Sequence, residues 1–422
     1  MAKQFKPETL CVQAGWTPKK GEPRVLPIYQ STTFKYDTSE QMARLFDLED
    51  SGYFYTRLQN PTNDAVAAKI AALEGGVAAM LTSSGQAANF YAIFNICQAG
   101  DHFVCSSAIY GGTFNLFGVT MRKLGIEVTF VNPDAGEEEI SAAFRPNTKA
   151  LFGETISNPS LEVLDIEKFA RIAHSHGVPL IVDNTSAITM VRPLEHGADI
   201  VVHSATKFLS GTGTSMGGVI VDGGTFNWAN GKFPQFTTPD PAYHGLIYSE
   251  AFGNKAYITK ARVHLMKDLG TVLSPINAFL ILQSIESLSL RVNQHCKNAL
   301  EIAKFLKNHE AVSWVNYPGL EDNENHEMAE KYLNGNYGGI VGFGIKGGLE
   351  EGKKFIESVE LLSHVANIGD AKSLVIHPAS TTHSNMTEEE QLEGGITPDF
   401  IRMSVGIENI DDLLADLEQA FA

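Results

Sequence analysis

The stretch PLIVDNTSAITMVRPLEHGADIVVHSATK, residues 179–207, carries the pattern that decides the fold. It contains two short apolar runs rich in Val and Ile, and a polar residue ends each run, Asp183 the first and Ser204 the second. Apolar runs that alternate with helical segments are typical of a mostly parallel sheet. In such sheets, ligands bind at the carboxyl ends of the strands. The stretch therefore predicts a fold class and also the edge of the sheet at which a site forms.

The same alternation continues toward the N-terminus. Apolar runs occur in AAMLTSS, DHFVCSS, EVTFVN and KALFGETI, and helical segments such as IEKFARIAHSHG separate them from the next run. An Ala-rich helix is expected before the first of these runs, from Asp64 to Leu73. We therefore predict an α/β protein in which helices cover both faces of a mostly parallel central sheet.

Toward the C-terminus the pattern changes. The amphipathic run from Ser274 to about Asn308 predicts one or two long helices. Apolar runs are sparser after it (GGIVGFGI, SLVIHPAS and FIRMSVGI), and a final helix follows them. This part is expected to form a smaller α+β domain.

We divide the chain into three parts on this basis. Residues 1–62 contain several Pro residues and the aromatic run Tyr53–Arg57 but little core of their own. They are expected to form an arm that packs on the body or on a neighbouring subunit. Residues 63–270 form the larger domain, in which 222–262, rich in aromatic residues, Gly and Pro, make a long surface insertion. Residues 271–422 form the C-terminal domain.

Composition and charge argue against several classes of protein. The formal net charge of −17 argues against nucleic-acid binding, which needs clustered Lys and Arg. No apolar run reaches the roughly 18 residues of a membrane span, and the start MAKQFKPETL lacks the apolar core of a secretory signal. The four cysteines form no CxxC pair and no zinc spacing, which favours a reduced, cytoplasmic compartment; they are Cys11, Cys97, Cys105 and Cys296.

Lys207 is the sharpest local feature, in Ser204-Ala-Thr206-Lys207. A lysine at the mouth of a buried strand is desolvated, which lowers its pKa and makes the amine a usable nucleophile. The two hydroxyl groups before it are placed to donate to a phosphate. Taken alone, a match of four residues is common by chance. A serine acyl-enzyme with the same S-x-x-K spacing would also need S-D-N and K-T-G elements, which do not accompany it here.

Three further features lie at predicted strand ends. Asp183 either caps the next helix or holds a protonated pyridine nitrogen, which would make a cofactor ring an electron sink. Ser83-Ser84-Gly85-Gln86 is a small-residue turn into a helix, where free N–H groups favour a phosphate. Tyr110 either lies flat on an aromatic ring or is a core tyrosine. Each signal is weak alone, but together they indicate one site at one edge of the sheet.

Other patterns carry no site in our interpretation. The glycines of Gly211-Thr-Gly213-Thr-Ser-Met-Gly217 resemble a dinucleotide loop, but the last spacing is one residue too long. Two histidine pairs lack a cluster of cysteine or carboxylate ligands beside them, so we predict no metal site; the pairs are His174 with His176 and His377 with His383.

Taken together, the motifs resemble those of the enzymes of cysteine and methionine metabolism. The resemblance covers essentially the whole chain, through PIYQSTTF, YTRLQNPT, SSGQAA, YGGTF, VDNT, SATKFLSG, HPASTTH and RMSVGIE. It implies the aspartate aminotransferase-like fold (fold type I) with pyridoxal 5′-phosphate as the cofactor, bound by the larger domain. It also implies a homotetramer in which a dimer is the minimal unit.

The resemblance further implies roles for individual residues. Lys207 would carry the cofactor, Asp183 would pair with its ring nitrogen, and Tyr110 would stack on the ring and move a proton. Arg402 and Asn367 would bind the substrate, Arg402 holding its carboxylate with the planar guanidinium. The remaining cofactor contacts would come from Ser84, Gly85, Gln86, Ser204, Thr206 and Asn158, and from Tyr55 and Arg57 of a neighbouring subunit.

Details within the family favour one group of its members. The insertion at 222–262 is similar to that of the O-acetylhomoserine sulfhydrylases, Asn367 stands where lyases commonly have Ser, and Gly112 stands where methionine γ-lyase has a cysteine. The resemblance thus implies a transferase of methionine biosynthesis that converts O-acetyl-L-homoserine and sulfide, or a thiol, to L-homocysteine, or a thioether, and acetate. Cystathionine γ-synthase chemistry and methionine γ-lyase-type elimination remain alternatives.

Overall fold

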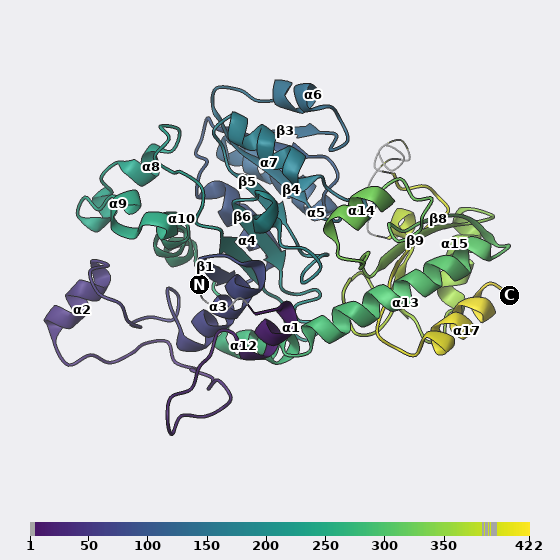
Figure 1. The fold of residues 1–422 in the computed structure, drawn as a ribbon, viewed down its shortest axis with the longest axis horizontal. Coiled ribbons are helices and arrows are strands. Elements are labelled where there is room, and N and C mark those ends of the chain that lie inside the picture. Colours follow the sequence, from purple (N-terminus) through teal and green to yellow (C-terminus); the bar gives the residue numbers. More distant parts are fainter. Residues whose placement is uncertain (1–4, 382–383, 385–386, 388, 390–394) are drawn as a thin grey trace.

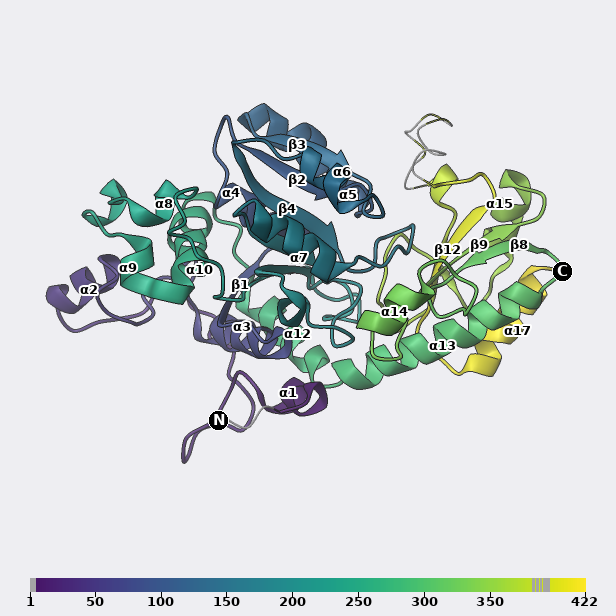
Figure 2. The same ribbon diagram turned by 45° about the horizontal axis from the view of Figure 1, so that its top comes forward.

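The computed structural model describes residues 5–381, 384, 387, 389 and 395–422, so His383 lies outside the described residues. Two sheets form two parts of the molecule, and the long helix α13 (Leu288–Asn308) runs from one part to the other (Figures 1 and 2). Within the described part of the chain, no helix is both long and apolar enough to cross a membrane. The divisions placed at residues 62 and 270 stay predictions.

The larger sheet has seven strands in the order β1-β7-β6-β5-β4-β2-β3. Strands β2 to β6 are mutually parallel, and only β7 runs antiparallel to its neighbours β1 and β6. This confirms the predicted mostly parallel sheet. The strands are β1 (Ala78–Thr82), β2 (His102–Ser106), β3 (Glu127–Val131), β4 (Thr148–Glu154), β5 (Leu180–Asp183), β6 (Ile200–Ser204) and β7 (Gly218–Asp222).

Helices cover both faces of this sheet because its central strands are apolar on both sides. Val182 and Val201 point to the face that is covered by α3 (Pro61–Glu74) and α7 (Ile166–Ser175). Their neighbours in sequence, Ile181 and Val202, point to the opposite face, which is covered by α4 (Gly85–Phe94). Because β1 runs in the same direction as β5 and β6, the turn from β1 into α4 lies at the same edge of the sheet as the carboxyl ends of β5 and β6.

The smaller sheet has five strands in the order β10-β11-β12-β9-β8, and only β10 and β11 are parallel. It is packed against α13, and the predicted run of residues 274–308 is two helices, α12 and α13, as expected. The strands are β8 (Val312–Asn316), β9 (Ile340–Ile345), β10 (Ser363–His364), β11 (Leu374–Ile376) and β12 (Phe400–Ser404); the helices here are α14 (His326–Tyr332), α15 (Leu349–Ser358) and α17 (Ile410–Ala420). Helix α12 (Pro275–Ile285) instead packs against α3 of the larger part.

The insertion at 222–262 has an aromatic core that no periodicity in the sequence indicates. The indole of Trp228 stacks on the ring of Tyr257 with centroids 5.0 Å apart, and Phe233 and Phe236 are fully buried beside it. Aromatic pairs of this kind stabilise a segment without needing a long helix or strand. The short helices of the insertion are α8 (Pro234–Thr237), α9 (Tyr248–Phe252) and α10 (Ala256–Lys260), and α11 (Lys267–Leu269) follows them. Two further short helices of the larger part, α5 (Gly111–Asn115) and α6 (Glu137–Ala142), lie apart from the insertion (Figure 1).

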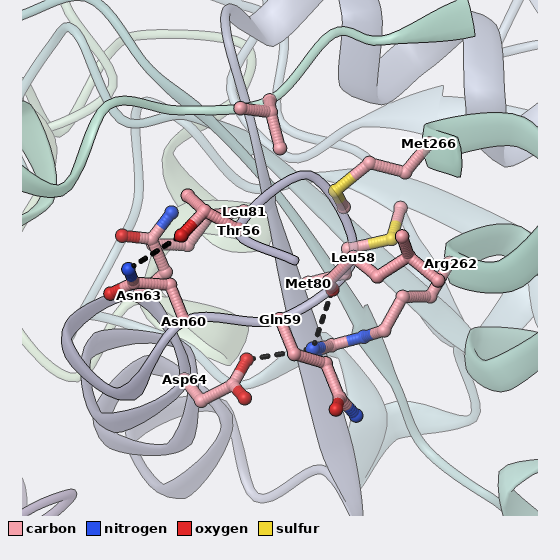
Figure 3. Close-up of a pocket in the computed structure, with 11 residues that line it drawn as sticks. Thr56, Leu58, Gln59, Asn60, Asn63, Asp64, Met80, Leu81, Arg262 and Met266 are labelled. Atoms are coloured by element: carbon pink, nitrogen blue, oxygen red, sulfur yellow. Dashed lines mark hydrogen bonds and ion pairs between the residues drawn. The ribbon is translucent and has the colours of Figure 1, made fainter. Parts of the chain in front are cut away.

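The N-terminal arm carries α1 (Pro7–Gln13) and α2 (Ser39–Phe46), and α2 projects away from the larger sheet (Figure 1). Arg262 holds the end of the arm: its guanidinium donates to Asp64 Oδ1 at 2.7 Å, to the carbonyl oxygen of Leu58 at 3.3 Å and to that of Ala79 at 3.1 Å. Arg262, Asp64 and Leu58 line a small pocket between the arm and the sheet (Figure 3). The clamp fixes the backbone just after Arg57.

Candidate active site

Lys207 lies three residues beyond the end of β6, and its Nζ donates a hydrogen bond to Asn367 Oδ1 at 2.5 Å. Burial of the side chain and, to a smaller extent, the positive charge of Arg402 together lower the pKa of Lys207 to about 8. This confirms the lowered pKa that its position at a strand end predicts. A substantial fraction of the amine is therefore neutral, and able to attack a carbonyl carbon, close to neutral pH.

The lowered pKa predicts the pH dependence of cofactor loading. Only the neutral amine of Lys207 reacts, so below pH 8 its reactive fraction falls about tenfold for each pH unit. We expect the rate at which cofactor-free protein takes up pyridoxal phosphate to rise about 50-fold between pH 6 and pH 8, and to level off above pH 9. Stopped-flow absorbance of the visible band measures this rate. A rate that still rises tenfold from pH 9 to pH 10 would mean that the amine has the ordinary pKa of an exposed lysine.

The first turn of α4 offers free backbone donors. Ser84 caps the helix: its Oγ accepts the N–H of Ala87 at 3.2 Å, and its carbonyl oxygen accepts that of Ala88 at 3.1 Å. The N–H groups of Gly85 and Gln86 precede the first intrahelical bond and have no helical partner. Together with the helix dipole they favour an anion at this end of α4.

Two hydroxyl groups lie beside this helix end. A Cβ atom on Gly85 would lie 2.6 Å from Cβ of Ser204, so glycine is required for α4 to approach the end of β6 this closely. Thr206 Oγ1 donates to the carbonyl oxygen of Gly217 at 3.3 Å and accepts its N–H at 3.2 Å. We call Gly85, Gln86, Ser204 and Thr206 the phosphate cluster.

Asp183 ends β5 with a buried carboxylate. Its Oδ1 accepts two hydrogen bonds from Thr185, from the backbone N–H at 3.0 Å and from the hydroxyl at 2.5 Å, and its Oδ2 accepts only a long bond of 3.5 Å from Asn89. Burial raises the pKa of Asp183, and the bonds from Thr185 oppose that rise. Oδ1 thus holds the turn after β5, as in the capping interpretation. Oδ2 is free to accept a hydrogen bond from a protonated ring nitrogen.

Tyr110 begins α5, and its side chain is half exposed. Its backbone N–H donates to Glu154 Oε2 at 2.7 Å. A Cβ atom on Gly112 would lie 2.5 Å from Cε1 of Tyr110 and 2.8 Å from Nε2 of Gln86. The tyrosine ring therefore lies against the residue that is a glycine here, and a larger side chain at that position would displace it.

Arg402 enters the site from β12 of the smaller sheet. Its Nη1 donates to Asn158 Oδ1 at 3.1 Å and its Nη2 to the carbonyl oxygen of Asn367 at 3.0 Å, while Nε has no partner among the described residues. Burial lowers the pKa of Arg402 to about 10, and the nearby hydroxyl of Tyr110 opposes that change. Arg402 is thus a charged, buried donor with an unused N–H, and Asn367 links it to Lys207.

The model of the Cys/Met metabolism PLP-dependent enzymes matches residues 8–422. The chain belongs to this family.

Relatives of known name agree with this assignment to the PLP-dependent family. The O-acetyl-L-homoserine sulfhydrylase of Leptospira meyeri is 52% identical over 100% of this chain and 97% of the relative, and the homocysteine synthase of Schizosaccharomyces pombe is 48% identical over 98% and 97%. The crystal structure of a putative O-acetylhomoserine (thiol)-lyase from Campylobacter jejuni, with N′-pyridoxyl-lysine-5′-monophosphate, is 39% identical, covers 99% of this chain and 100% of that one, and has a TM-score of 0.95. The predicted fold type I architecture and the predicted pyridoxal phosphate cofactor are confirmed.

The residues of this PLP-dependent enzyme fit the cofactor. A helix end with free N–H groups lies against the side chain of Ser204, and glycine at position 85 is what allows this close approach. Lys207 would carry the cofactor, the phosphate cluster would hold its phosphate, and Asp183 Oδ2 would hold its ring nitrogen. The cluster of free donors is the chemistry that a phosphate group needs.

The structure does not bring Tyr55 and Arg57 to the phosphate cluster of their own chain. Both are exposed on the arm, where the guanidinium carbon of Arg57 lies 5.1 Å from the centroid of the Tyr55 ring. Among the described residues, no hydrogen bond or ion pair joins either side chain to that cluster. This placement agrees with a role toward another subunit.

Sequence reasoning missed three residues of the site: Glu154, Thr185 and Asn89. Glu154 carried a usable signal, because it ends the apolar run KALFGE in the way that Asp183 ends PLIVD. Thr185 and Asn89 carried no such signal in the sequence, because their importance comes only from their hydrogen bonds to Asp183.

The other candidate motifs have structural partners. His174 Nε2 pairs with Asp199 Oδ2 at 2.8 Å, and the ring of His176 stacks on Phe144 with centroids 4.1 Å apart. His377 bonds to the hydroxyl of Ser380 and to the carbonyl oxygen of Pro398. The glycine loop approaches Arg291, since a Cβ atom on Gly211 would lie 2.0 Å from its Nη1.

Proposed function

We propose that the protein is an O-acetyl-L-homoserine sulfhydrylase, which replaces the acetate group on Cγ of its substrate by sulfide. One C–O bond breaks and one C–S bond forms, giving L-homocysteine and acetate. The observation that carries this choice is the packing at Gly112, where the residue against the Tyr110 ring has no side chain and hence no thiol to assist elimination. The printed names of the Leptospira and Schizosaccharomyces relatives support the same reaction.

The chain's own residues divide the work of this reaction. Pyridoxal phosphate, when bound, acts as an electron sink for the carbanion formed on the substrate. Arg402 binds the substrate carboxylate through its unused N–H, and Asp183 keeps the proton on the ring nitrogen. Lys207 would remove the α proton and then a β proton of the substrate, a task suited to an amine with a pKa of about 8. Tyr110 moves a proton at Cγ.

The decisive test is the partition between two products. We expect homocysteine formation from O-acetyl-L-homoserine and sulfide to exceed 2-oxobutyrate formation by at least about tenfold, a difference of about 1.4 kcal/mol in competing barriers. One incubation is scored for both products, and a second contains methionine alone. Fast oxoacid release from methionine, with little homocysteine in the first tube, would assign the protein to the lyases. Cystathionine formed in preference when cysteine competes with sulfide would assign it to the synthases.

We further propose that the active site is shared between subunits of a homotetramer built from dimers, in the cytoplasm. The arm exposes large apolar side chains, including Val25, Ile28 and Phe46, which a second subunit would cover. Tyr55 and Arg57 would then reach the phosphate of the neighbouring subunit. The reduced compartment is supported by the four cysteines, all of them free.

Subunit complementation tests the shared site. Arg57→Ala and Lys207→Ala are each expected to be inactive, and mixing them under subunit exchange should restore up to about a quarter of the wild-type activity, because one site in a mixed dimer is free of both changes. A matched control mixes two samples of Lys207→Ala, which should stay inactive. Mixed oligomers without any recovered activity would place Arg57 and Lys207 in the site of one chain.

A further inference from the structure

A second buried carboxyl group lies beside the site. Glu154 is the last residue of β4, and it pairs in register with Asp183, the last residue of β5. Its side chain is 5% exposed. Residues that pair in register on neighbouring strands point to the same face of a sheet. The two carboxyl groups therefore share one face and one edge, yet the proposed reaction gives a task only to Asp183.

Glu154 has a defined partner at this edge. Its Oε2 accepts the backbone N–H of Tyr110 at 2.7 Å. Tyr110 is the N-cap residue of α5, and its own side chain makes no capping bond. Its carbonyl oxygen accepts the N–H groups of Thr113 and Phe114, so that oxygen is held by the short helix. The bond to Glu154 is what ties this residue back to the central sheet.

The backbone bond to Glu154 also sets the position of the Tyr110 ring, which few other contacts hold. The side chain of Tyr110 is 49% exposed, so little packing on the outside holds it. On the inside it lies against Gly112, at the distances given above. A residue held on few sides depends strongly on its backbone anchor.

The charge of Glu154 is suppressed by its surroundings. Burial raises the pKa of this carboxyl group well above its ordinary value, the neighbouring Asp183 raises it further, and the bond from Tyr110 opposes both. Two like charges on paired positions are unfavourable, and Asp183 is the one that a ring nitrogen would stabilise. A neutral carboxyl group still accepts an N–H bond through its carbonyl oxygen.

We propose that Glu154 is a positioning residue, which acts only as a hydrogen-bond acceptor for Tyr110 and thereby fixes the tyrosine ring over the cofactor. The inference rests on the proposed role of Tyr110 as the stacking ring. It predicts that the acceptor oxygen is required and that an ionisable group is not.

Two variants separate these requirements. E154Q keeps an acceptor oxygen at the same reach, whereas E154M keeps the volume but has no oxygen acceptor. We expect E154M to weaken pyridoxal phosphate binding and to lower kcat/KM by about tenfold or more, since a small displacement of a positioned group is costly. E154Q should restore both values to within about threefold of wild type. The visible circular dichroism band of the loaded protein, which reports the setting of the ring, should change only in E154M.

A double-mutant cycle decides whether the effect passes through Tyr110. In a Tyr110→Ala background, E154M should cause no further loss, because coupled residues are not additive. Thermal unfolding of each variant checks the fold, and Glu154→Leu replaces E154M if that variant fails to fold. The proposal is overturned if E154Q is as impaired as E154M, or if E154M costs the same with and without the tyrosine ring. Cofactor affinity and dichroism do not depend on which reaction is catalysed, so they remain informative if the sulfhydrylase assignment fails.

Discussion

Lys207→Ala is expected to lower turnover by at least about 10³-fold, because it removes both the amine that carries the cofactor and the base that moves the substrate protons. The variant should fold, since within the described part of the chain the side chain of Lys207 makes a single hydrogen bond, to Asn367. The steady-state rate of homocysteine formation measures the loss. Borohydride reduction of the wild-type protein should leave a pyridoxyl mass on the peptide that contains Lys207.

Other lysines provide the control for this assignment. Burial also lowers the pKa of Lys69 and of Lys260, so a lowered pKa by itself does not single out Lys207. Lys69 Nζ donates to the carbonyl oxygen of Cys11, and Lys260 Nζ lies 5.8 Å from the ring centroid of Phe236. A pyridoxyl mass on either peptide in place of the Lys207 peptide would end the assignment.

Asp183→Asn is expected to lower turnover by about 10²-fold or more while the protein stays folded and loaded with cofactor. An amide has no negative charge with which to hold the proton on the ring nitrogen, so the ring withdraws electrons less strongly. The amide oxygen can still accept the two bonds from Thr185, which preserves the turn after β5. Turnover and the absorbance of the loaded variant are measured together.

Asp222→Asn is the matched control for this change. Asp222 ends β7 of the same sheet, and burial raises its pKa to about 7. Its Oδ1 accepts the N–H of Gly224 at 2.9 Å and its Oδ2 that of Ile258 at 3.3 Å, so an amide oxygen can keep the shorter of these two bonds. The control should retain normal turnover. Near-normal turnover in a soluble, loaded Asp183→Asn variant would show that this residue has no electrostatic role.

Much of the larger sheet could be predicted because its signals are local. The apolar runs that end in Asp183 and Ser204 become β5 and β6, and their neighbours become β2 to β4. Each strand needs only its own few residues to be apolar, so composition along the chain reveals it. The insertion at 222–262 resisted prediction because its stability comes from pairs such as Trp228 and Tyr257, whose spacing follows no helix or strand period.

The residues of the candidate site likewise fall into those that the sequence indicates and those that only the tertiary structure reveals. Sequence alone predicted Lys207, Asp183 and the turn before Gln86 as members of one site, because a polar residue at the end of an apolar strand is visible locally and parallel strands bring their ends to one edge. Only the tertiary structure decided that Asn367, 160 positions from Lys207, bonds to its amine. It also decided which oxygen of Asp183 is free and that Glu154 holds Tyr110. These contacts join elements far apart in the chain, and burial and distance exist only once the two sheets have packed.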